Sequence, residues 1–277
     1  MPSTNYDLSA ITSVEYDGTS LSEIILDGTS IWTPRNSVTV TISADTNNYT
    51  LTPAAVAGYS AGITDVSFVV NSGVVIGSST TATAALTVSG FASGDVVTVN
   101  NSGYIVGAGG RGGNSNTNNA TVGGTAITTT SPIEINNLGT ISGGGGGGGA
   151  RDHTTTTTST TAYVPCTGKG SSGCGGIVTT YTNTYYSGSP GGGGAGRIVG
   201  QPGTVTAHGN STPAAGSAGS LTTGGAGGST KAAGAGGALG QNGVSGTWAG
   251  GLAGHYIIGS GFATWISVGT RAGRTAT

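Results

Sequence analysis

The stretch "ISGGGGGGGARDHTTTTTSTTAYVP" covers residues 141–165 and contains seven consecutive glycines, 143–149. Such a run ordinarily marks a flexible linker. Similar tracts recur, however, as "GAGGRGG" (107–113), "PGGGGAGR" (190–197), "TGGAGG" (223–228) and "GAGGALGQNGVSG" (234–246). Because the tracts alternate with β-rich segments, the pattern favours an ordered glycine structure over a linker.

The last tract has glycine at every third residue: Gly234, Gly237, Gly240, Gly243 and Gly246. A period of three is typical of a polyproline-II helix, which makes no internal hydrogen bonds. Its buried N–H and C=O groups must therefore pair with neighbouring helices, and close approach excludes side chains. We expect a bundle of polyglycine-II helices with 143–149 at its centre and with 107–113 and 234–246 on its faces. Collagen is excluded, since the chain has 8 prolines and no long Gly-X-Y run.

Composition and charge narrow the class of protein. The 277 residues include 57 glycines, and only 6% are charged, so disorder driven by charge fits poorly. The first 103 residues carry eight acids and one base, a charge of −7, and the remainder carry two acids and seven bases, a charge of +5. Bases this sparse argue against a nucleic-acid partner. The absence of a long apolar run or a secretory signal predicts a soluble protein made in the cytosol.

Three regions are expected along the chain. Residues 1–35 contain the repeat "EYDGTSLS" and "ILDGTSIW", whose Asp-Gly pairs predict tight hairpins in a small β attachment module that docks on a partner. Residues 36–103 alternate as strands do and hold most of the large apolar side chains, which predicts a β-rich middle domain. Residues 104–277 form the glycine-rich bundle. The fold class is therefore mainly β and irregular, with almost no α-helix.

A second repeat spans the boundary between the last two regions. The segment "TVNNSGYIVGAGGRGG" (98–113) is echoed thirty-six residues later by "EINNLGTISGGGGGGG" (134–149). Each copy reads as a strand, an Asn-Asn turn, a short strand and a glycine tract. The segments between tracts, 114–134, 150–189 and 198–222, are long and polar, and we expect them to be variable loops on a fixed scaffold.

The loop at 150–189 is the richest in chemistry. Tyrosines among small polar residues resemble an antibody paratope, in which Tyr supplies contact area at low entropic cost. The alternative is that Tyr163 and Tyr185 or Tyr186 simply pack two strands of one hairpin. Cys166 and Cys174 close a small disulfide loop or are two free thiols. The candidate binding residues are Arg151, His153, Tyr163, Lys169, Tyr181, Tyr185 and Tyr186, with His208 in the next loop.

The chain resembles a known family, the glycine-rich receptor-recognising adhesins at the long-tail-fibre tips of T-even-type tailed bacteriophages. The resemblance rests on "YIVGAGGRGG", "ISGGGGGGG", "PGGGGAGR" and the ending "GGLAGHYIIGSGFATWISVGTRAG", and covers residues 98–277. It implies a layered polyglycine-II sandwich whose loops bind a host outer-membrane protein or lipopolysaccharide. It also implies a place at the tail or tail-fibre tip of the virion, with the N-terminal region bound to other tail proteins.

Residues 1–97 show no match to that family's fibre-attachment domain, so attachment at a fibre tip or at the central tail tip stays open. Two alternatives also stay open: a structural tail-tip protein without a receptor role, and a surface-glycan depolymerase. A glycosidase needs two neighbouring carboxylates, and the loop-bearing half offers only Glu134 and Asp152. Three isolated histidines, His153, His208 and His255, do not suggest a metal site. We therefore expect no enzyme, metal or cofactor.

An ice-binding protein is a further alternative. Glycine-rich polyproline-II bundles occur in that class, and the threonines at 154–158 would suit an ice-binding face. Such bundles are more strictly periodic in triplets, and they need no acidic β-modules at the N-terminus. The sequence therefore favours the adhesin.

Overall fold

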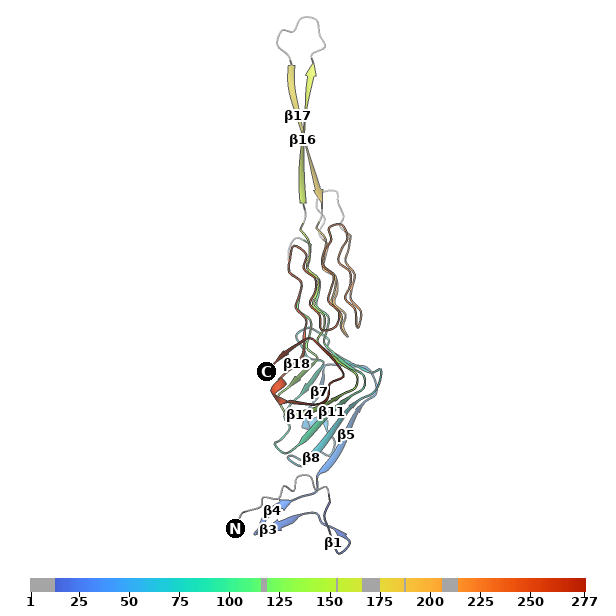
Figure 1. Cartoon of the computed structure of the whole chain (residues 1–277), viewed down its shortest axis with the longest axis vertical. Helices are drawn as coiled ribbons and strands as arrows, with labels where there is room; N and C mark the ends of the chain where they lie inside the picture. The colour runs from blue at the N-terminus through green and yellow to red at the C-terminus, as the bar shows by residue number, and fades with distance from the viewer. Residues whose placement is uncertain (1–12, 116–118, 153, 166–174, 187, 206–213) are drawn as a thin grey trace. The chain divides into compact units, whose positions relative to one another are not determined.

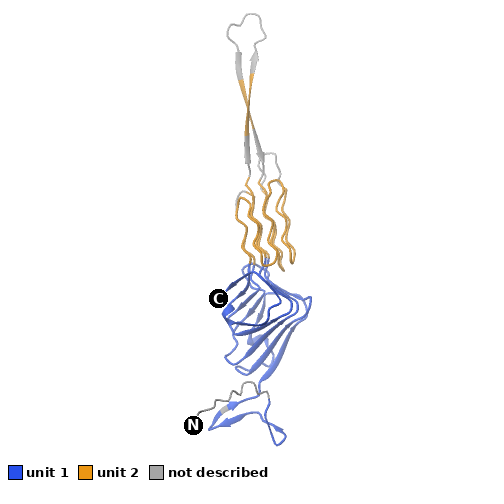
Figure 2. Ribbon diagram, viewed as in Figure 1, with its two compact units in different colours: residues 1–108, 124–144, 254–277 blue, residues 109–123, 145–253 orange. Residues whose placement is uncertain are grey.

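The computed structural model describes residues 13–115, 119–152, 154–165, 175–186, 188–205 and 214–277. Figure 1 shows that these residues are β-rich, and apart from two three-residue 3₁₀ turns, η1 (Pro53–Ala55) and η2 (Ser260–Phe262), they form no helix. No helix in this part of the chain has the length and apolarity of a membrane span. The chain divides into two compact units (Figure 2): residues 1–108, 124–144 and 254–277, and residues 109–123 and 145–253.

Two short antiparallel hairpins begin the first unit. β1 (Glu15–Tyr16) pairs with β2 (Thr19–Ser20), and β3 (Ile24–Leu26) pairs with β4 (Thr29–Trp32). Both turns have positive φ at Asp and Gly, 51° and 74° in the first and 49° and 75° in the second. Because Asp-Gly pairs tolerate this backbone in two-residue hairpin turns, the sequence-based hairpin prediction is confirmed.

The rest of the first unit consists of three five-stranded parallel sheets. Successive strands pass from one sheet to the next, so each circuit of the chain adds one strand to every sheet and builds a β-solenoid. The first sheet contains β5 (Asn36–Ile42), β8 (Thr64–Val70), β11 (Val96–Asn101), β14 (Ile133–Asn137) and β19 (Ala263–Ser267). The second contains β6 (Thr46–Asn47), β9 (Val75–Gly77), β12 (Tyr104–Val106), β15 (Thr140–Ser142) and β20 (Thr270–Ala272). The third contains β7 (Tyr49–Leu51), β10 (Leu86–Val88), β13 (Ile127–Thr129), β18 (His255–Ile258) and β21 (Arg274–Ala276).

Columns of apolar side chains fill the solenoid. Alternate residues of each strand face inward, and parallel in-register pairing stacks them from one circuit to the next. One column in the first sheet is Val40, Phe68, Val99, Ile135 and Trp265. Phe68, Val99 and Ile135 are fully buried there, whereas Trp265 in the last circuit is half-buried. The last circuit thus closes the core with a large aromatic side chain.

The thirty-six-residue repeat is one circuit of this solenoid. Thr98 pairs with Glu134 and Tyr104 with Thr140, so equivalent positions of the two copies lie side by side. The domain boundary expected between residues 103 and 104 therefore differs from the structure, in which strands from 127–142 and 255–276 complete the sheets. The glycine-rich segments are insertions between β12 and β13 and between β15 and β18. A domain boundary drawn from composition misses these insertions, because the chain returns to the same sheets after each one.

Tyr256 and Trp265 belong to β18 and β19 of the solenoid. Their rings meet edge-to-face with centroids 6.1 Å apart. The Arg271 guanidinium lies 5.2 Å from the Tyr256 ring and 4.8 Å from the Trp265 ring. Arg271 follows Ile76, Ile105 and Ile141 in the register of the second sheet, so a cation stacked on aromatic rings replaces the apolar column in the final circuit.

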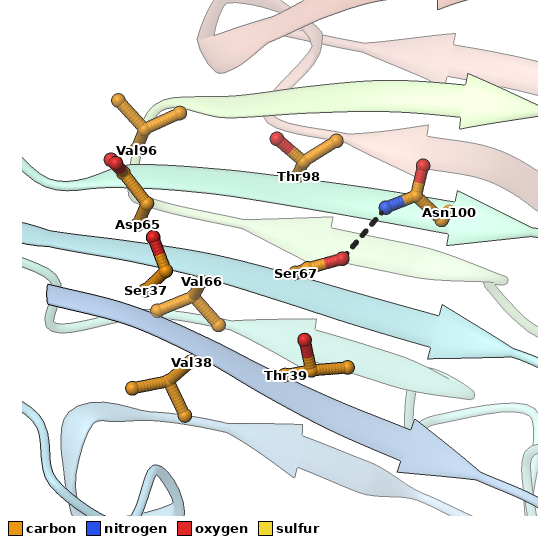
Figure 3. Close-up of a pocket in the computed structure, with 9 residues that line it drawn as sticks. All are labelled: Ser37, Val38, Thr39, Asp65, Val66, Ser67, Val96, Thr98 and Asn100. Atoms are coloured by element: carbon orange, nitrogen blue, oxygen red, sulfur yellow. Dashed lines mark hydrogen bonds between the residues drawn. The ribbon is translucent and has the colours of Figure 1, made fainter. Parts of the chain in front are cut away.

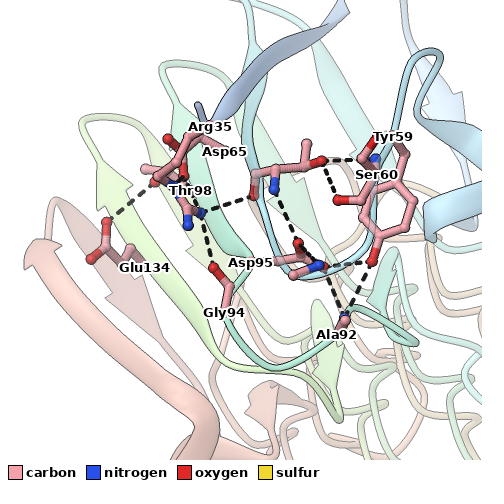
Figure 4. A network of polar contacts seen from close by, with 11 residues as sticks. Arg35, Tyr59, Ser60, Asp65, Ala92, Gly94, Asp95, Thr98 and Glu134 are labelled. Atoms are coloured by element: carbon pink, nitrogen blue, oxygen red, sulfur yellow. Dashed lines mark hydrogen bonds and ion pairs between the residues drawn. The ribbon is translucent and has the colours of Figure 1, made fainter. Parts of the chain in front are cut away.

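A polar network joins three segments of the solenoid at its first circuits (Figure 4). Arg35 forms an ion pair with Asp65 at 2.6 Å and donates to the carbonyl of Gly94 at 2.9 Å. Asp95 accepts hydrogen bonds from the Tyr59 hydroxyl and from backbone N–H groups at 62, 64 and 92. Burial acts to raise the pKa of Asp95, but these hydrogen bonds outweigh it and leave the pKa below its usual value.

The second unit contains extended glycine-rich segments that hydrogen-bond to one another through the backbone. The segment 145–149, called the central segment here, has every residue buried, as predicted. Its N–H groups donate to segments 190–196, 241–246 and 119–123, and its carbonyls accept from segments 109–113, 233–238 and 248–253. The partner changes at each residue and returns after three, since 145 and 148 both donate to 190–196 and 146 and 149 both donate to 241–246. A fully buried backbone is thereby satisfied without a β-ladder.

Glycine is required in the central segment because the neighbours leave no room for a side chain. A Cβ on Gly146 would overlap the carbonyl oxygen of Gly251, and one on Gly148 would overlap that of Gly234. Segment 190–196 is likewise entirely buried. In the segment 234–246, predicted to lie on a face, Gly234 and Gly237 are buried and the other residues are half-buried or exposed. The tract 107–113 was also expected on a face, but Arg111 is its only exposed residue.

Two of the three expected loops are shorter than predicted. Residues 119–123 of the interval 114–134 are a backbone-bonded segment, and 127–129 and 133–137 are strands of the solenoid. Within 198–222, residues 198–204 and 214–220 are also hydrogen-bonded segments. The sequence misled because these segments carry Thr, Ser and Ala between their glycines, a composition that ordinarily indicates a loop.

Candidate functional site

Residues on both sides of the interval 153–187 meet two other turns at one end of the glycine segments. Arg151 and Ser189 exchange both backbone hydrogen bonds, at 2.9 and 3.1 Å. The Arg151 Nε donates to the carbonyl of Ala232 at 3.0 Å. The Trp248 indole N–H donates to the Asp152 carboxylate. These contacts bring 150–152, 188–190, 230–232 and 247–248 together into a hydrogen-bonded base, called the hairpin base here.

A long antiparallel hairpin follows from this base. β16 (Thr154–Pro165) and β17 (Gly175–Tyr186) have 12 residues each and pair throughout, from Thr154 opposite Tyr186 to Pro165 opposite Gly175. β-branched threonines and Val, Ile and Tyr suit the pleated backbone of a strand, and cross-strand pairs such as Thr160 with Thr180 suit one another. The sequence interpretation of 150–189 as a loop is thus refined to a two-stranded ribbon.

The described side chains of the ribbon are exposed to solvent. All residues in 157–162 and 178–182 are exposed, among them Val178 at 50% and Tyr181 at 70%. A two-stranded ribbon with both faces in water has little burial to stabilise it. Burial of its exposed Tyr181 and Val178 side chains against a partner would lower the free energy, because apolar surface would leave water.

The predicted site residues are distributed as follows. Arg151 belongs to the hairpin base, and its side chain is committed to Ala232 rather than free for a ligand. Tyr181 lies exposed in the middle of β17. Tyr163, Tyr185 and Tyr186 lie in the ribbon, with Cα atoms opposite Ile177, Thr155 and Thr154, and their side chains lie outside the described part of the structure. His153, Lys169 and His208, and the thiols Cys166 and Cys174, also lie outside the described residues.

Sequence reasoning missed two parts of the hairpin base: the turn at 230–232 and Trp248. Successive glycine segments run in opposite directions, so every second connection between them lies at the same end of the unit. The alternation of tracts and connections was visible in the sequence and could have indicated that these turns meet 150–152. The partner of Asp152 could not be found in this way, because it lies 96 residues away.

The carboxylates considered for a glycosidase have structural partners. Glu134 accepts from the Thr98 hydroxyl at 3.2 Å in the solenoid, and Asp152 accepts from Trp248 in the second unit. A shallow groove of about 220 Å³ lies on the first sheet (Figure 3), lined by side chains such as Thr39, Ser67, Thr98 and Asn100. Asp65 is the one carboxylate among its lining residues, and it is paired with Arg35. A glycosidase uses a pair of carboxylates, so this groove does not supply that chemistry.

The histidine that the structure describes, His255, begins β18. Burial, followed by the charge of Arg274, lowers its pKa. Within the ranges described, no group of three or more His, Cys, Asp or Glu side chains is placed to hold a metal ion.

The fold and site define a β-rich protein that carries an exposed two-stranded ribbon. The chain belongs to the phage tail fibre adhesin Gp38 family, which matches residues 37–276. It is also similar to a solved structure, the crystal structure of the gp37–gp38 adhesin tip complex of the bacteriophage S16 long tail fiber. That similarity has a TM-score of 0.53 at 23% identity and covers 87% of this chain and 82% of the other. Comparison with curated proteins gave no match.

The family match corrects the expected extent of the resemblance. Residues 37–97, which the sequence interpretation set apart from the family, lie within the match, and residues 1–36, which include the two hairpins, remain outside its N-terminal end. The structural reason is that the strands of 37–97 and those of 98–142 build the same sheets. Family membership gives the chain a place in the tail fibre of a virion.

Proposed function

We propose that this chain is a receptor-recognising adhesin at a tail-fibre tip, and that its second unit is a polyglycine-II sandwich carrying the receptor-binding loops. The three-residue return of hydrogen-bond partners along the central segment supports the polyglycine-II assignment, because a polyproline-II-type helix has three residues per turn. The central segment hydrogen-bonds to six neighbouring segments, which corresponds to hexagonal packing of such helices.

The same hydrogen bonds arrange the segments in three layers. One layer is formed by backbone hydrogen bonds from 119–123 to 109–113 and from 109–113 to 198–204. A second is formed in the same way by 241–246, 233–238 and 223–228. Between them run 248–253, the central segment, 190–196 and 214–220. In this arrangement the two fully buried segments, the central segment and 190–196, occupy the middle layer, and glycine fills most of their positions. A scaffold held by its own backbone leaves the connecting residues free to change.

The observation that carries the receptor role is the exposed ribbon of β16 and β17 on its hydrogen-bonded base. Binding energy at protein interfaces concentrates in a few aromatic and Arg side chains. Tyr181 is such a side chain, and at 70% exposure it contributes little to packing within the chain. We propose that the ribbon contacts an outer-membrane protein or lipopolysaccharide of the host, with Tyr163, Tyr185, Tyr186, His153, Lys169 and His208 as further contact residues.

Adsorption competition with purified full-length protein tests the proposal. The protein should block phage adsorption, and host mutants lacking single outer-membrane proteins or the outer lipopolysaccharide sugars should identify the receptor. Replacing Tyr181 by Ala should weaken competition by roughly thirtyfold, the effect of losing about 2 kcal/mol at an anchor residue. Tyr16, another exposed tyrosine, supplies the matched control Tyr16→Ala, which should compete normally.

A triple variant with Ala at positions 181, 185 and 186 extends the test to the whole ribbon. It should lose binding while its melting temperature stays near that of the wild type. A triple variant that still competes normally would exclude the ribbon as the receptor site and leave a purely structural role in the tail. A protein that shortens surface glycan while binding cells would favour the depolymerase instead.

The similar solved structure is a complex of gp37 with gp38 at an adhesin tip. By analogy, we propose that this chain is mounted on the virion through another tail or tail-fibre protein.

A further inference from the structure

The two N-terminal hairpins are copies of one structural unit. The first pairs Glu15 with Ser20 and Tyr16 with Thr19, and the second pairs Ile25 with Ser30 and Leu26 with Thr29. Every position in the second set is displaced by ten residues from the first, and the φ angles of the two turns agree within 2°. Both hairpins lie ahead of residue 37, where the family match begins.

Both copies expose apolar side chains at equivalent positions. Tyr16 is 76% exposed and Leu26, its counterpart, is 60% exposed. Ile25 in the second copy is also exposed. Two-stranded hairpins of this size have little stability of their own, so an exposed apolar side chain beside each turn gains most when another surface covers it.

The two hairpins are also acidic. Glu15, Asp17, Glu23 and Asp27 are exposed, and residues 13–34 contain no Lys, Arg or His. The four negative charges would repel a second copy presenting the same surface, whereas they would attract a basic one. The charge therefore selects a partner of a different kind.

We infer that the tandem hairpins are a two-part docking surface for a basic region of another virion protein, which presents an apolar recess for Tyr16 and an equivalent one for Leu26. The inference rests on the proposed role of the chain as a mounted tail-fibre adhesin and identifies the chemistry of its mount. Two identical hairpins on one chain fit a partner whose binding surface is itself repeated, as on an oligomer. Two weak contacts joined by a short connection bind together far more tightly than either alone.

In vitro incorporation tests this inference. Virions made without the chain are mixed with purified full-length protein, separated on a gradient, and assayed for bound protein. Tyr16→Ser and Leu26→Ser should each raise the concentration needed for half-maximal incorporation by about tenfold, and the double variant should abolish incorporation. Val244→Ser and Leu252→Ser, which change exposed apolar residues of the second unit, should incorporate normally.

A second pair of variants tests the charge without removing apolar surface. Asn tolerates the positive φ of positions 17 and 27, so Asp17→Asn with Asp27→Asn preserves both turns. This variant should need several-fold more protein for half-maximal incorporation, and the dependence of its incorporation on salt should be shallower than that of the wild type. Deleting residues 1–33 while keeping Arg35 and its ion pair with Asp65 should also abolish incorporation.

Normal incorporation of the Tyr16→Ser and Leu26→Ser double variant would overturn the inference. So would a dimer of the wild-type chain in sedimentation that this double variant dissolves, since the partner would then be a second copy. All variants are also scored as free protein in adsorption competition. The ribbon variants should incorporate normally into virions. If they also bind cells normally, the receptor proposal is overturned. The docking inference is unaffected by that outcome, because it depends on the hairpin variants.

Discussion

The side-chain amide of Asn101 donates a hydrogen bond of 2.8 Å to the side-chain oxygen of Asn137, thirty-six residues later. Both side chains are buried, at 1% and 0% exposure, at the same corner of successive circuits of the solenoid. Asn137 in turn donates to the carbonyls of Val268 and Thr270 in the last circuit. One column of amides therefore satisfies the backbone at the corner where three circuits turn.

Asn137→Leu should destabilise the first unit by about 2–4 kcal/mol. The substitution removes the acceptor of the buried Asn101 amide and the donor to the carbonyls of Val268 and Thr270, and a buried group left unpaired costs about 1–3 kcal/mol. Chemical denaturation of the full chain measures the change. Asn136→Leu, at the half-buried neighbouring position on the outer face of the sheet, is the control and should cost much less. Equal destabilisation by the two variants would show that the buried ladder has no special role.

Gly146→Val should be far more destabilising than Ala238→Val. A side chain at 146 overlaps the Gly251 carbonyl and separates segments that the backbone alone holds together, so several hydrogen bonds fail at once. We expect a loss of at least about 3 kcal/mol at 146 and less than about 0.5 kcal/mol at the exposed position 238. Thermal unfolding of both proteins checks this, and similar melting temperatures would contradict a core made of backbone.

Acid should remove the stabilisation that Asp95 provides. Because its folded-state pKa lies below the unfolded value, the stabilisation is complete above the ordinary Asp pKa of about 3.9 and disappears as pH falls through the lowered folded-state pKa. Asp95→Asn should therefore lower the melting temperature at pH 7, and the difference from wild type should close in acid. Asp27→Asn, an exposed residue of the second hairpin, should show no difference at either pH. A gap at Asp95 that stays constant down to about pH 2 would mean that the carboxylate charge is not what stabilises the site.

Replacing residues 154–186 with a short Gly-Ser connection should leave the second unit folded. The hairpin base is held by the paired backbone of Arg151 and Ser189 and by the bonds of Asp152 to Trp248 and of Arg151 to Ala232, none of which uses the ribbon. We expect a melting temperature close to that of the wild type together with complete loss of competition for phage adsorption. A large drop in melting temperature would instead assign the ribbon a structural role.

The sequence by itself determined the parts of this protein whose physics is local. Asp-Gly pairs specify the two turns because few other residues accept positive φ there. The recurrence of glycine tracts, with a period of three residues in 234–246, predicted that the run at 143–149 is buried backbone rather than a linker, because residues without side chains allow close packing of polyproline-II-type helices. The thirty-six-residue repeat was also visible, since stacked circuits place like residues on like.

Only the tertiary structure decided how these parts combine. Parallel sheets form between segments far apart in the sequence, and strands from 255–276 complete circuits begun before residue 142, which composition cannot reveal. The same holds at the hairpin base, where Asp152 meets Trp248 and Arg151 meets Ala232 across glycine segments that return to one end. These contacts depend on which glycine-rich segments are neighbours. The order of the segments is set by backbone hydrogen bonds, and the sequence does not reveal it because every glycine offers the same N–H and C=O groups.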